Sequence, residues 1–528
     1  MAFTFQILPV RGQSPSQGIN TVFLLPNDWD DYNYKTIFGL IIFDEQGNKF
    51  DLGSVKIGYS EQPSGWTKEH LPLQFQTLPE TFFSLGQDAD YYAKLVDNFS
   101  EEIVTSFLTA LGDIASMPIR FELAKDEGVF HNSFLRTVNQ TSIEHQFRRI
   151  LSHQTPLTDF NFIYKKESNP RYAGFQLEFT IEPGSKPASN IHILIGRNGV
   201  GKTTLLNNMV DALLPDRGTV EETGSFLTPA SWGDPSSLDD DYFAGIVSVS
   251  FSAFDPFSPP ENQSDPSQGL RYCYIGLKKR LSQSGQTIWG LKTKDELESD
   301  FTNSAKLCFA LTGKRNRWDN AIAKLESDSN FAEMNLIQLI NSYDEDTSTD
   351  KHLFSEKAHS LFKRMSSGHA IVLLTITKLV ETVEEKTLVL IDEPESHLHP
   401  PLLSAFTRAL SDLLVNRNAL AIIATHSPVV LQEVPKSCVS ILRRTRLTAN
   451  IDRLEKETFA ENVGVLTREV FDLEVSKSGF YDLLKKEVSD GLSYDEIIER
   501  YQDQLGLEGK LLLKSMVTTR DLDLGNSE

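Results

Sequence analysis

The sequence predicts an α/β protein with a mixed sheet layered by helices, preceded by a β-rich α+β accessory domain and followed by a helical tail. Three observations predict this class. Short β-like runs separated by Pro, Gly and Asn-Asp turns, followed by a helical stretch, make up residues 1–150. From 158 to 446, apolar strands alternate with helical stretches, and a glycine-rich turn joins one strand to a helix. Residues 447–528 return to a helical pattern.

Composition excludes several classes of protein. The chain has 528 residues, 40% hydrophobic, and its 51 Lys+Arg against 73 Asp+Glu give a net charge of −22. This balance excludes a protein that coats nucleic acid through bulk positive charge. The three cysteines lie far apart without a CxxC pair, which excludes a disulfide framework and favours a reducing compartment. With no signal-peptide pattern and no long apolar run, we expect a cytoplasmic protein without a membrane partner.

The accessory domain, 1–150, contains the β-like runs FTFQIL, TVFLL, TIFGLIIF and FDLGSVKIGY. Apolar residues at three- and four-residue steps predict a helical stretch near 91–114. No chemistry is evident here. The rest divides into a lobe with a phosphate motif (158–269), a helical insertion (270–364), a segment with three further motifs (365–446) and the helical tail (447–528).

A phosphate site is predicted at GRNGVGKT, 196–203, which fits G-x-x-x-x-G-K-[ST] between an apolar strand and a helix. Glycines let successive N–H groups point at phosphate oxygens, and the helix amino terminus adds positive potential. Lys202 would reach the β- and γ-phosphates, and the Thr203 hydroxyl would bind magnesium. A simple glycine turn would require neither residue. The residues expected to contact the nucleotide here are Gly196, Asn198, Gly199, Gly201, Lys202, Thr203 and Thr204.

Two carboxylates follow the apolar strand TLVLI at its carboxyl end, where open α/β sheets bind ligands. Asp392 can hold magnesium, directly or through water. Glu393 is then placed to orient and polarise the attacking water. A buried strand that merely ends in an acidic turn is the alternative, and the complete phosphate motif upstream argues against it.

A histidine, His426, ends a third apolar strand, LAIIAT. A lone histidine is often structural, but this one ends the strand that follows the Asp-Glu strand, which favours a contact with the γ-phosphate. The segment MSSGH, 365–369, precedes a long apolar helix. It is either a helix cap or an anion cradle. One nucleotide does not need two cradles, whereas two copies arranged head to tail do.

In this order, GRNGVGKT, MSSGH, LVLIDEP and ATHSP resemble the Walker A, signature, Walker B and switch-histidine motifs of ABC-type ATPases, over residues 158–445. DEPESHLHP and ATHSPVVLQEVP resemble the forms found in the SMC, RecF and OLD branch. The short helical insertion and the segments SVSFSAFDPF and ENVGVLTREVF resemble the ATPase subunits of Septu-type anti-phage systems (PtuA-like proteins), including those that accompany retrons.

The resemblance implies ATP and Mg²⁺ as cofactors and a homodimer, or a higher oligomer, that closes around ATP. Ser366, Ser367 and Gly368 would touch the γ-phosphate across the interface, and His426 would sense it. The signature departs from the Leu-Ser-Gly-Gly-Gln of transporters. The family's magnesium-contacting glutamine has no clear counterpart, and the candidates are Ser252, Asp255 and Gln263.

A nuclease is not evident in the chain. OLD-type relatives carry a TOPRIM nuclease, which needs an Asp-x-Asp at a strand end, and the near miss, 521–523, lies in the terminal tail. The HLHP segment, 397–400, belongs to the ATPase turn rather than to an HNH site, and as a zinc pair it lacks a third ligand. We therefore expect a separate HNH-type nuclease subunit, with nucleic acid or a retron reverse transcriptase–RNA/DNA complex as further partners.

Three functions compete. The leading one is an ATPase, converting ATP and water to ADP and phosphate, whose closure regulates a separate effector nuclease in anti-phage defence. The second is a DNA-binding clamp of RecF or SMC type in DNA repair or maintenance. The third, a transporter subunit, is disfavoured by the long amino-terminal extension. Basic clusters at 278–280, 443–446 and 148–149 are either solvated faces or nucleic-acid contacts.

Overall fold

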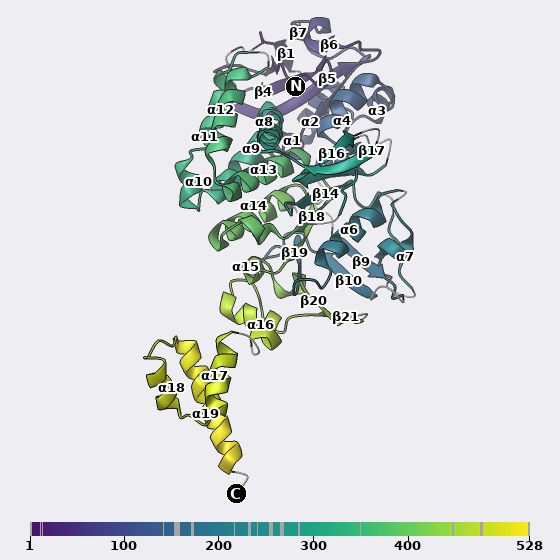
Figure 1. Ribbon diagram of the computed structural model, residues 1–528. Coiled ribbons are helices and arrows are strands. Elements are labelled where there is room, and N and C mark those ends of the chain that lie inside the picture. The colour runs from purple at the N-terminus through teal and green to yellow at the C-terminus, as the bar shows by residue number, and fades with distance from the viewer. Residues whose placement is uncertain are drawn as a thin grey trace. The chain divides into compact units, whose positions relative to one another are not determined.

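The computed structural model (Figure 1) divides into two compact units, Met1–Phe459 and Ala460–Glu528. The residues that the structure describes are 3–10, 12, 14–140, 142–152, 159–169, 174–215, 217–230, 234–239, 241–252, 257–264, 269–283, 286–348, 350–445, 448–475 and 479–525.

The amino-terminal part of the first unit is built on a six-stranded sheet in the order β7-β1-β2-β4-β5-β8. Only β1 and β2 run parallel, and alternate side chains of β2 are buried, as expected for a strand with one face on the core. The strands are β1 (Thr4–Ile7), β2 (Thr21–Pro26), β4 (Ile37–Phe43), β5 (Lys49–Tyr59), β7 (Gln74–Phe75) and β8 (Phe82–Gly86). A smaller pair comprises β3 (Tyr34–Lys35) and β6 (Gly65–Trp66), which η1 (Thr67–His70) follows.

Helices cover this sheet and bury an aromatic-rich core. The predicted helical stretch near 91–114 is two helices, because Phe99 leaves helical geometry (φ −130°, ψ 152°) and the second helix ends at Gly112 in the left-handed region (φ 60°). The helical segments are α1 (Ala89–Asn98), α2 (Glu101–Leu111), α3 (Pro118–Ala124), the π-helical η2 (Phe130–Phe134), α4 (Leu135–Thr137), the π-helical η3 (Ser142–Phe147) and α5 (Arg148–Leu151).

The second sheet of this unit has seven strands in the order β15-β14-β18-β19-β11-β20-β21. All neighbours run parallel except β20 and β21, so the carboxyl ends of the central strands meet at one edge. The strands are β11 (Ile191–Ile195), β14 (Gly245–Ser250), β15 (Arg271–Gly276), β18 (Thr387–Asp392), β19 (Leu420–Thr425), β20 (Val439–Thr445) and β21 (Thr448–Asp452).

One helix, α6 (Lys202–Leu213), packs between this sheet and a four-stranded antiparallel sheet of order β10-β9-β12-β13. Its buried side chains, among them Leu205 and Met209, share one core with residues of both sheets. The small sheet comprises β9 (Phe160–Lys166), β10 (Phe175–Ile181), β12 (Ser225–Thr228) and β13 (Ser236–Ser237), with α7 (Val220–Thr223) beside it. Two layers of sheet thus hold the helix that follows the glycine-rich turn.

Further helices contact the seven-stranded sheet: α13 (Ser367–Thr382) packs on β14 and β15, and α14 (Pro400–Asn416) on β19. The short segments η5 (Pro394–His397) and α15 (Pro428–Leu431) follow β18 and β19, and η6 (Lys436–Cys438) directly precedes β20. The helical lobe itself comprises α8 (Lys294–Ala310), α9 (Thr312–Leu325), α10 (Ser329–Glu333), α11 (Ile337–Glu345) and α12 (His352–Arg364).

Two predicted ranges need correction. The insertion 270–364 is helical only from Lys294, because β15 completes the edge of the seven-stranded sheet and β16 (Lys278–Gln283) and β17 (Gln286–Leu291) form an antiparallel hairpin. Alternation in RYCYIG and the aromatic IWG segment favour strands over helices. The tail predicted as helical from 447 begins with β21, which pairs with β20.

Buried ion pairs join the amino-terminal domain to the ATPase part of the same unit. The Asp88 carboxylate, at the start of α1, contacts the guanidinium of Arg317 on α9 and lies 3.6 Å from that of Arg417. Arg417 also pairs with Glu384, which lies 3.3 Å from the ammonium of Lys314. Burial alone would raise the pKa of Asp88, but the two arginines lower it. Breaking such a buried pair leaves an uncompensated charge, so this network fixes the two parts together.

A buried histidine on β11 predicts a pH-dependent stability. Burial lowers the pKa of His192 to about 4, although the hydrogen bond from Nε2 to the Thr180 carbonyl (3.1 Å) opposes the shift. The unfolded chain takes up this proton near pH 6.5, so the stability contribution is complete above pH 6.5 and is lost as the pH falls towards 4. Between pH 7 and pH 5 we expect a loss of about 2 kcal/mol from this residue.

The comparison that checks this prediction is denaturant unfolding of the wild type and His192→Leu at both pH values. The substitution removes the titrating ring, so the wild type should lose more stability than the variant on acidification. Equal losses would show that His192 is not the group responsible.

The second unit is helical and contains α16 (Val463–Val475), α17 (Phe480–Ser489), α18 (Tyr494–Arg500) and α19 (Leu507–Gly525). Its small core comprises Leu484, Val488, Ile497, Leu513 and Val517. Ser493 and Glu496 form a capping box at the start of α18. Among the residues that the structure describes, no helix has the length and apolar character needed to cross a membrane.

Candidate nucleotide site

The glycine-rich turn lies between β11 and α6, at the carboxyl edge of the seven-stranded sheet. Gly199 (φ 81°) and Gly201 (φ 101°) adopt left-handed backbone conformations that favour glycine. A Cβ added to Gly196 would lie 2.5 Å from the Leu442 carbonyl oxygen of β20, so only glycine fits there. These constraints shape the loop that starts α6, and they leave the helix amino terminus to receive an anion.

Lys202 begins α6 and turns back over the loop. Its ammonium donates to the carbonyl oxygens of Gly196 (3.0 Å) and Arg197 (3.2 Å), and the side chain is buried. Burial lowers the pKa of Lys202, while nearby Glu393, Glu395 and Asp392 oppose the shift. The ammonium is therefore held within the curl of backbone where the motif would seat a phosphate.

The two predicted carboxylates lie at the end of β18. Asp392 is in register with Ala424 of β19, and the Glu393 N–H donates to the Ala424 carbonyl (2.9 Å). Glu393 adopts a left-handed conformation (φ 45°, ψ 60°), which is strained for a residue with a Cβ. Such strain concentrates at functional sites. Because β19 lies between β18 and β11, the carboxylates and the glycine-rich turn share one edge of the sheet.

His426 follows β19, between those two strands. Its Nδ1 lies 3.8 Å from Glu393 Oε1 and 3.0 Å from Glu395 Oε1. The same Glu395 oxygen accepts from the Thr425 hydroxyl (2.6 Å) and from the His426 N–H (2.6 Å). The structure thus brings the predicted histidine to the predicted carboxylate, and Glu395 holds the histidine backbone through the His426 N–H.

Glu395 was missed in the sequence. Its side chain is 8% exposed, and among the described residues its Oε2 has no hydrogen-bond partner. Its position two residues after Glu393 offered a signal, but its partners come from a strand 30 residues later. A buried carboxylate oxygen of this kind suits a water molecule or a cation.

The residues present fit magnesium and a triphosphate. Asp392, Glu393 and Glu395 gather three carboxylates around the ammonium of Lys202. A triphosphate would meet repulsion from this set unless a divalent cation accompanied it. Carboxylate and hydroxyl oxygens are the ligands that Mg²⁺ prefers, and Asp392 and Thr203 supply them.

The predicted signature lies elsewhere in the unit. Ser366 caps α13, and Gly368 is so close to the His397 carbonyl oxygen that an added Cβ would lie 2.4 Å from it. His369, in the first turn of α13, contacts Asp328 at the start of α10. In Figure 1, α10 and α6 lie on opposite sides of β14 and β18. Leu388 and Leu390 of β18 share the core of α6, whereas Ile391 of β18 lines a pocket with Ile371 and Val372 of α13. The sheet therefore lies between the helix that Ser366 caps and the helix that Lys202 begins.

A pocket beside the glycine-rich turn adds residues that the motif did not indicate. Phe175 of β10, Asn208 of α6 and Arg444 of β20 line it together with Gly201 and Thr204. Arg443 and Arg444 of the predicted basic cluster therefore border the phosphate loop, and Arg443 Nε also lies 2.8 Å from Asp452. Arg446 lies outside the described residues.

The three candidates for a magnesium-contacting residue separate in space. Gln263 forms an isolated bridge with Tyr272, near the amino-terminal end of β15, so it lies away from the carboxyl edge of the sheet. Ser252 follows β14, whose last residue, Ser250, is in register with Asp392. Asp255 lies outside the described residues. Gln263 is thereby removed from the candidates.

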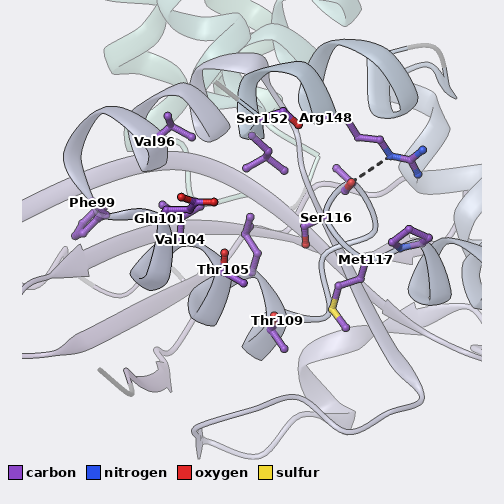
Figure 2. A pocket seen from close by; sticks show the side chains of 14 residues that line it. Val96, Phe99, Glu101, Val104, Thr105, Thr109, Ser116, Met117, Arg148 and Ser152 are labelled. Carbon is purple, nitrogen blue, oxygen red and sulfur yellow. Dashed lines mark hydrogen bonds between the residues drawn. The ribbon is translucent and has the colours of Figure 1, made fainter. Parts of the chain in front are cut away.

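A separate cavity of about 380 Å³ lies in the amino-terminal domain (Figure 2). Side chains of α1, α2 and α5 line it, and Arg148 donates from Nε to the Ala115 carbonyl (3.2 Å). Its lining mixes apolar side chains such as Val104 and Met117 with Glu101 and hydroxyl groups. The cavity shares no lining residue with the nucleotide site.

Two family models match the chain. The model described as "ABC transporter" matches residues 176–247, which hold the glycine-rich turn and α6. The model described as "AAA domain, putative AbiEii toxin, Type IV TA system" matches residues 304–432, which hold the signature, both carboxylates and His426. The fold is thus that of an ABC-type P-loop ATPase, with a β-rich domain before it and a helical region after it.

A curated relative matches along its whole length. Protein ea59 of Escherichia phage lambda is 45% identical over 531 residues, which cover 98% of this chain and 98% of that protein.

Among solved structures, a nucleotide-free ATP-binding cassette of an ABC transporter is 12% identical with a TM-score of 0.29, covering 61% of this chain and all of its own. An SMC head bound to the C-winged helix domain of ScpA is 11% identical with a TM-score of 0.27, covering 56% and 96%. These scores are low, and the fold assignment rests on the family models and on the sheet order and phosphate loop described above.

Proposed function

The chain belongs to the family of protein ea59 of phage lambda and is an ATP-binding ATPase of the ABC type, and from this premise we propose that two copies close around ATP and hydrolyse it. The observation that carries the proposal is the position of the signature. Ser366, Ser367 and Gly368 form a second anion cradle at the amino terminus of α13, on the other side of the sheet strands from α6. A second copy can bring this cradle to the phosphate loop of the first.

Within one site, different residues of the chain bind the phosphates, the nucleoside, the magnesium ion and the attacking water. The N–H groups of 196–203 and the Lys202 ammonium bind the phosphates, and the pocket at Phe175 and Arg444 receives the nucleoside. Thr203 and Asp392 hold magnesium, which neutralises phosphate charge when bound. Glu393 orients the attacking water and accepts its proton, and His426 faces the γ-phosphate from the end of β19. Positioning and charge neutralisation then suffice to give ADP and phosphate.

If two copies of the chain pair around ATP, the mass of the protein in solution should depend on ATP. With Mg²⁺ and a slowly hydrolysed ATP analogue, the wild-type protein should double in mass in sedimentation experiments, because each signature completes the partner's site. Gly368→Ala should bind nucleotide normally but pair at least tenfold more weakly, since its Cβ would displace the signature from the His397 carbonyl. A protein that stays monomeric with bound nucleotide would contradict the pairing.

We further propose that closure regulates a separate nuclease, of HNH type, in anti-phage defence. Support comes from the family model matched at 304–432, whose description names a toxin of a toxin–antitoxin system, and from the resemblance to Septu-type subunits. Purification of the native complex with the product of the neighbouring gene tests this. Recovery of a nuclease whose cleavage changes with ATP is the expected result. ATP-dependent DNA binding by the chain alone would instead favour a clamp of the RecF or SMC type.

A further inference from the structure

Three polar side chains contact one another in succession at the amino terminus of α13. Ser366 Oγ lies 2.6 Å from Nδ1 of His369, and Nε2 of the same ring lies 3.2 Å from Asp328 Oδ1. Ser366 caps α13, His369 lies in its first turn, and Asp328 caps α10 through the Phe331 N–H (3.1 Å). Hydrogen-bonded carboxylate–imidazole–hydroxyl arrangements are known from unrelated folds, where they orient the hydroxyl group.

The surroundings hold these three side chains in place. The side chain of Asp328 is 6% exposed and that of His369 is 12% exposed, so water competes little for either. The second oxygen of Asp328 lies 3.0 Å from His399 Nε2, and the Phe331 ring packs 5.2 Å from the His369 ring. In the described part of the chain, the charged or titratable groups in contact with the His369 ring or its carboxylate partner are Asp328 at the start of α10 and His399 just before α14, with 6.3 Å between the two histidine rings.

Two proton placements fit these distances, and they have opposite consequences for Ser366. If His369 is neutral and donates from Nε2 to Asp328, Nδ1 accepts the Ser366 hydroxyl hydrogen, and Ser366 has no donor left for a phosphate. If His369 is an imidazolium, Nδ1–H donates to Ser366 Oγ, and the hydroxyl hydrogen is free to point outward. A γ-phosphate carries only acceptor oxygens, so it requires the second arrangement.

We propose that Asp328 and His369 are positioning residues that turn the Ser366 hydroxyl towards the γ-phosphate of ATP bound by a second copy of this chain. Asp328 compensates the positive charge of the imidazolium. The Nδ1–H of the imidazolium donates to a lone pair of Ser366 Oγ, so the hydroxyl hydrogen points away from the ring. The inference rests on the proposed paired site. It adds that the donor capacity of the signature depends on a proton held inside the chain that supplies it.

The test measures the dissociation constant of the ATP-bound dimer in a Glu393→Gln parent that retains ATP. His369→Leu should weaken pairing at least tenfold, as expected for the loss of a charge-assisted hydrogen bond. Asp328→Asn keeps an oxygen to cap α10 but removes the charge, and it should weaken pairing to a similar extent.

His369→Gln is the decisive variant, because its side-chain amide can donate to Ser366 in place of the ring. It should pair within about threefold of the parent, whereas a purely structural role of the ring would leave it as weak as His369→Leu. His352→Leu, which changes an exposed histidine on α12, is the matched control and should behave as the parent. Nucleotide binding to each monomer, measured separately, shows that the variants remain folded.

The outcomes separate the two proposals. If the parent does not dimerise in the presence of ATP, the paired site is wrong, and the proposed role of Ser366 is wrong as well. If the parent pairs and His369→Leu pairs equally well, or if His369→Gln pairs as weakly as His369→Leu, the positioning role is wrong while the paired site stands.

Discussion

Glu393→Gln should reduce steady-state ATP hydrolysis by at least 100-fold while leaving ATP binding intact. Glutamine matches the shape of glutamate, but its amide cannot accept the proton of the attacking water. The left-handed backbone at Glu393 and its 3.8 Å approach to His426 place this carboxylate at the phosphate edge of the sheet. Phosphate release at saturating ATP measures the loss, and filter retention of labelled ATP shows that the nucleotide stays bound.

The matched control for this prediction is Glu356→Gln, an exposed carboxylate on α12 whose substitution should leave turnover unchanged. Rapid turnover by Glu393→Gln would move the water-orienting role to another group. Glu395 is the nearest alternative, because its Oε2 is buried without a hydrogen-bond partner in the described part of the chain.

Lys202→Ala should weaken ATP binding by at least 100-fold. The ammonium is the only cation directed onto the Gly196 and Arg197 carbonyls among the contacts that the structure describes. Without it, three nearby carboxylates face the triphosphate, and the buried ammonium that offsets their charge is lost. Titration with a fluorescent ATP analogue measures the change.

Lys125→Ala, at an exposed lysine on the surface of the amino-terminal domain, serves as the control for charge removal. Near-normal affinity in Lys202→Ala would mean that the glycine-rich loop is not where the triphosphate binds.

The parts of the site that were predictable from sequence are those built by contiguous residues. The strands LVLID and LAIIAT are apolar on both faces, as buried parallel strands require, and each ends at its functional residue. The glycine-rich turn carries its own constraints on backbone conformation. The fold class followed from these segments because strand, turn and helix alternate regularly around them.

The parts that were not predictable depend on partners distant in sequence. Glu395 acquires its role from Thr425 and His426, and Asp328 from His369 on a later helix. The hairpin β16–β17 was taken for part of a helical insertion because local pattern does not show which strands find a neighbour. The residue type of Gln263 suited a magnesium contact, but its bridge to Tyr272 places it near the amino-terminal end of β15, away from the carboxyl edge of the sheet.

The most direct test of a triphosphate shared between two chains is to mix two inactive variants. Lys202→Ala lacks a phosphate-binding lysine and Ser366→Ala lacks a signature hydroxyl, so each should be nearly inactive alone. In a mixed pair, the intact signature of the first meets the intact phosphate loop of the second, and an equal mixture should recover about a quarter of the wild-type rate per chain. A mixture no more active than its components, or full activity of Ser366→Ala alone, would contradict the shared site.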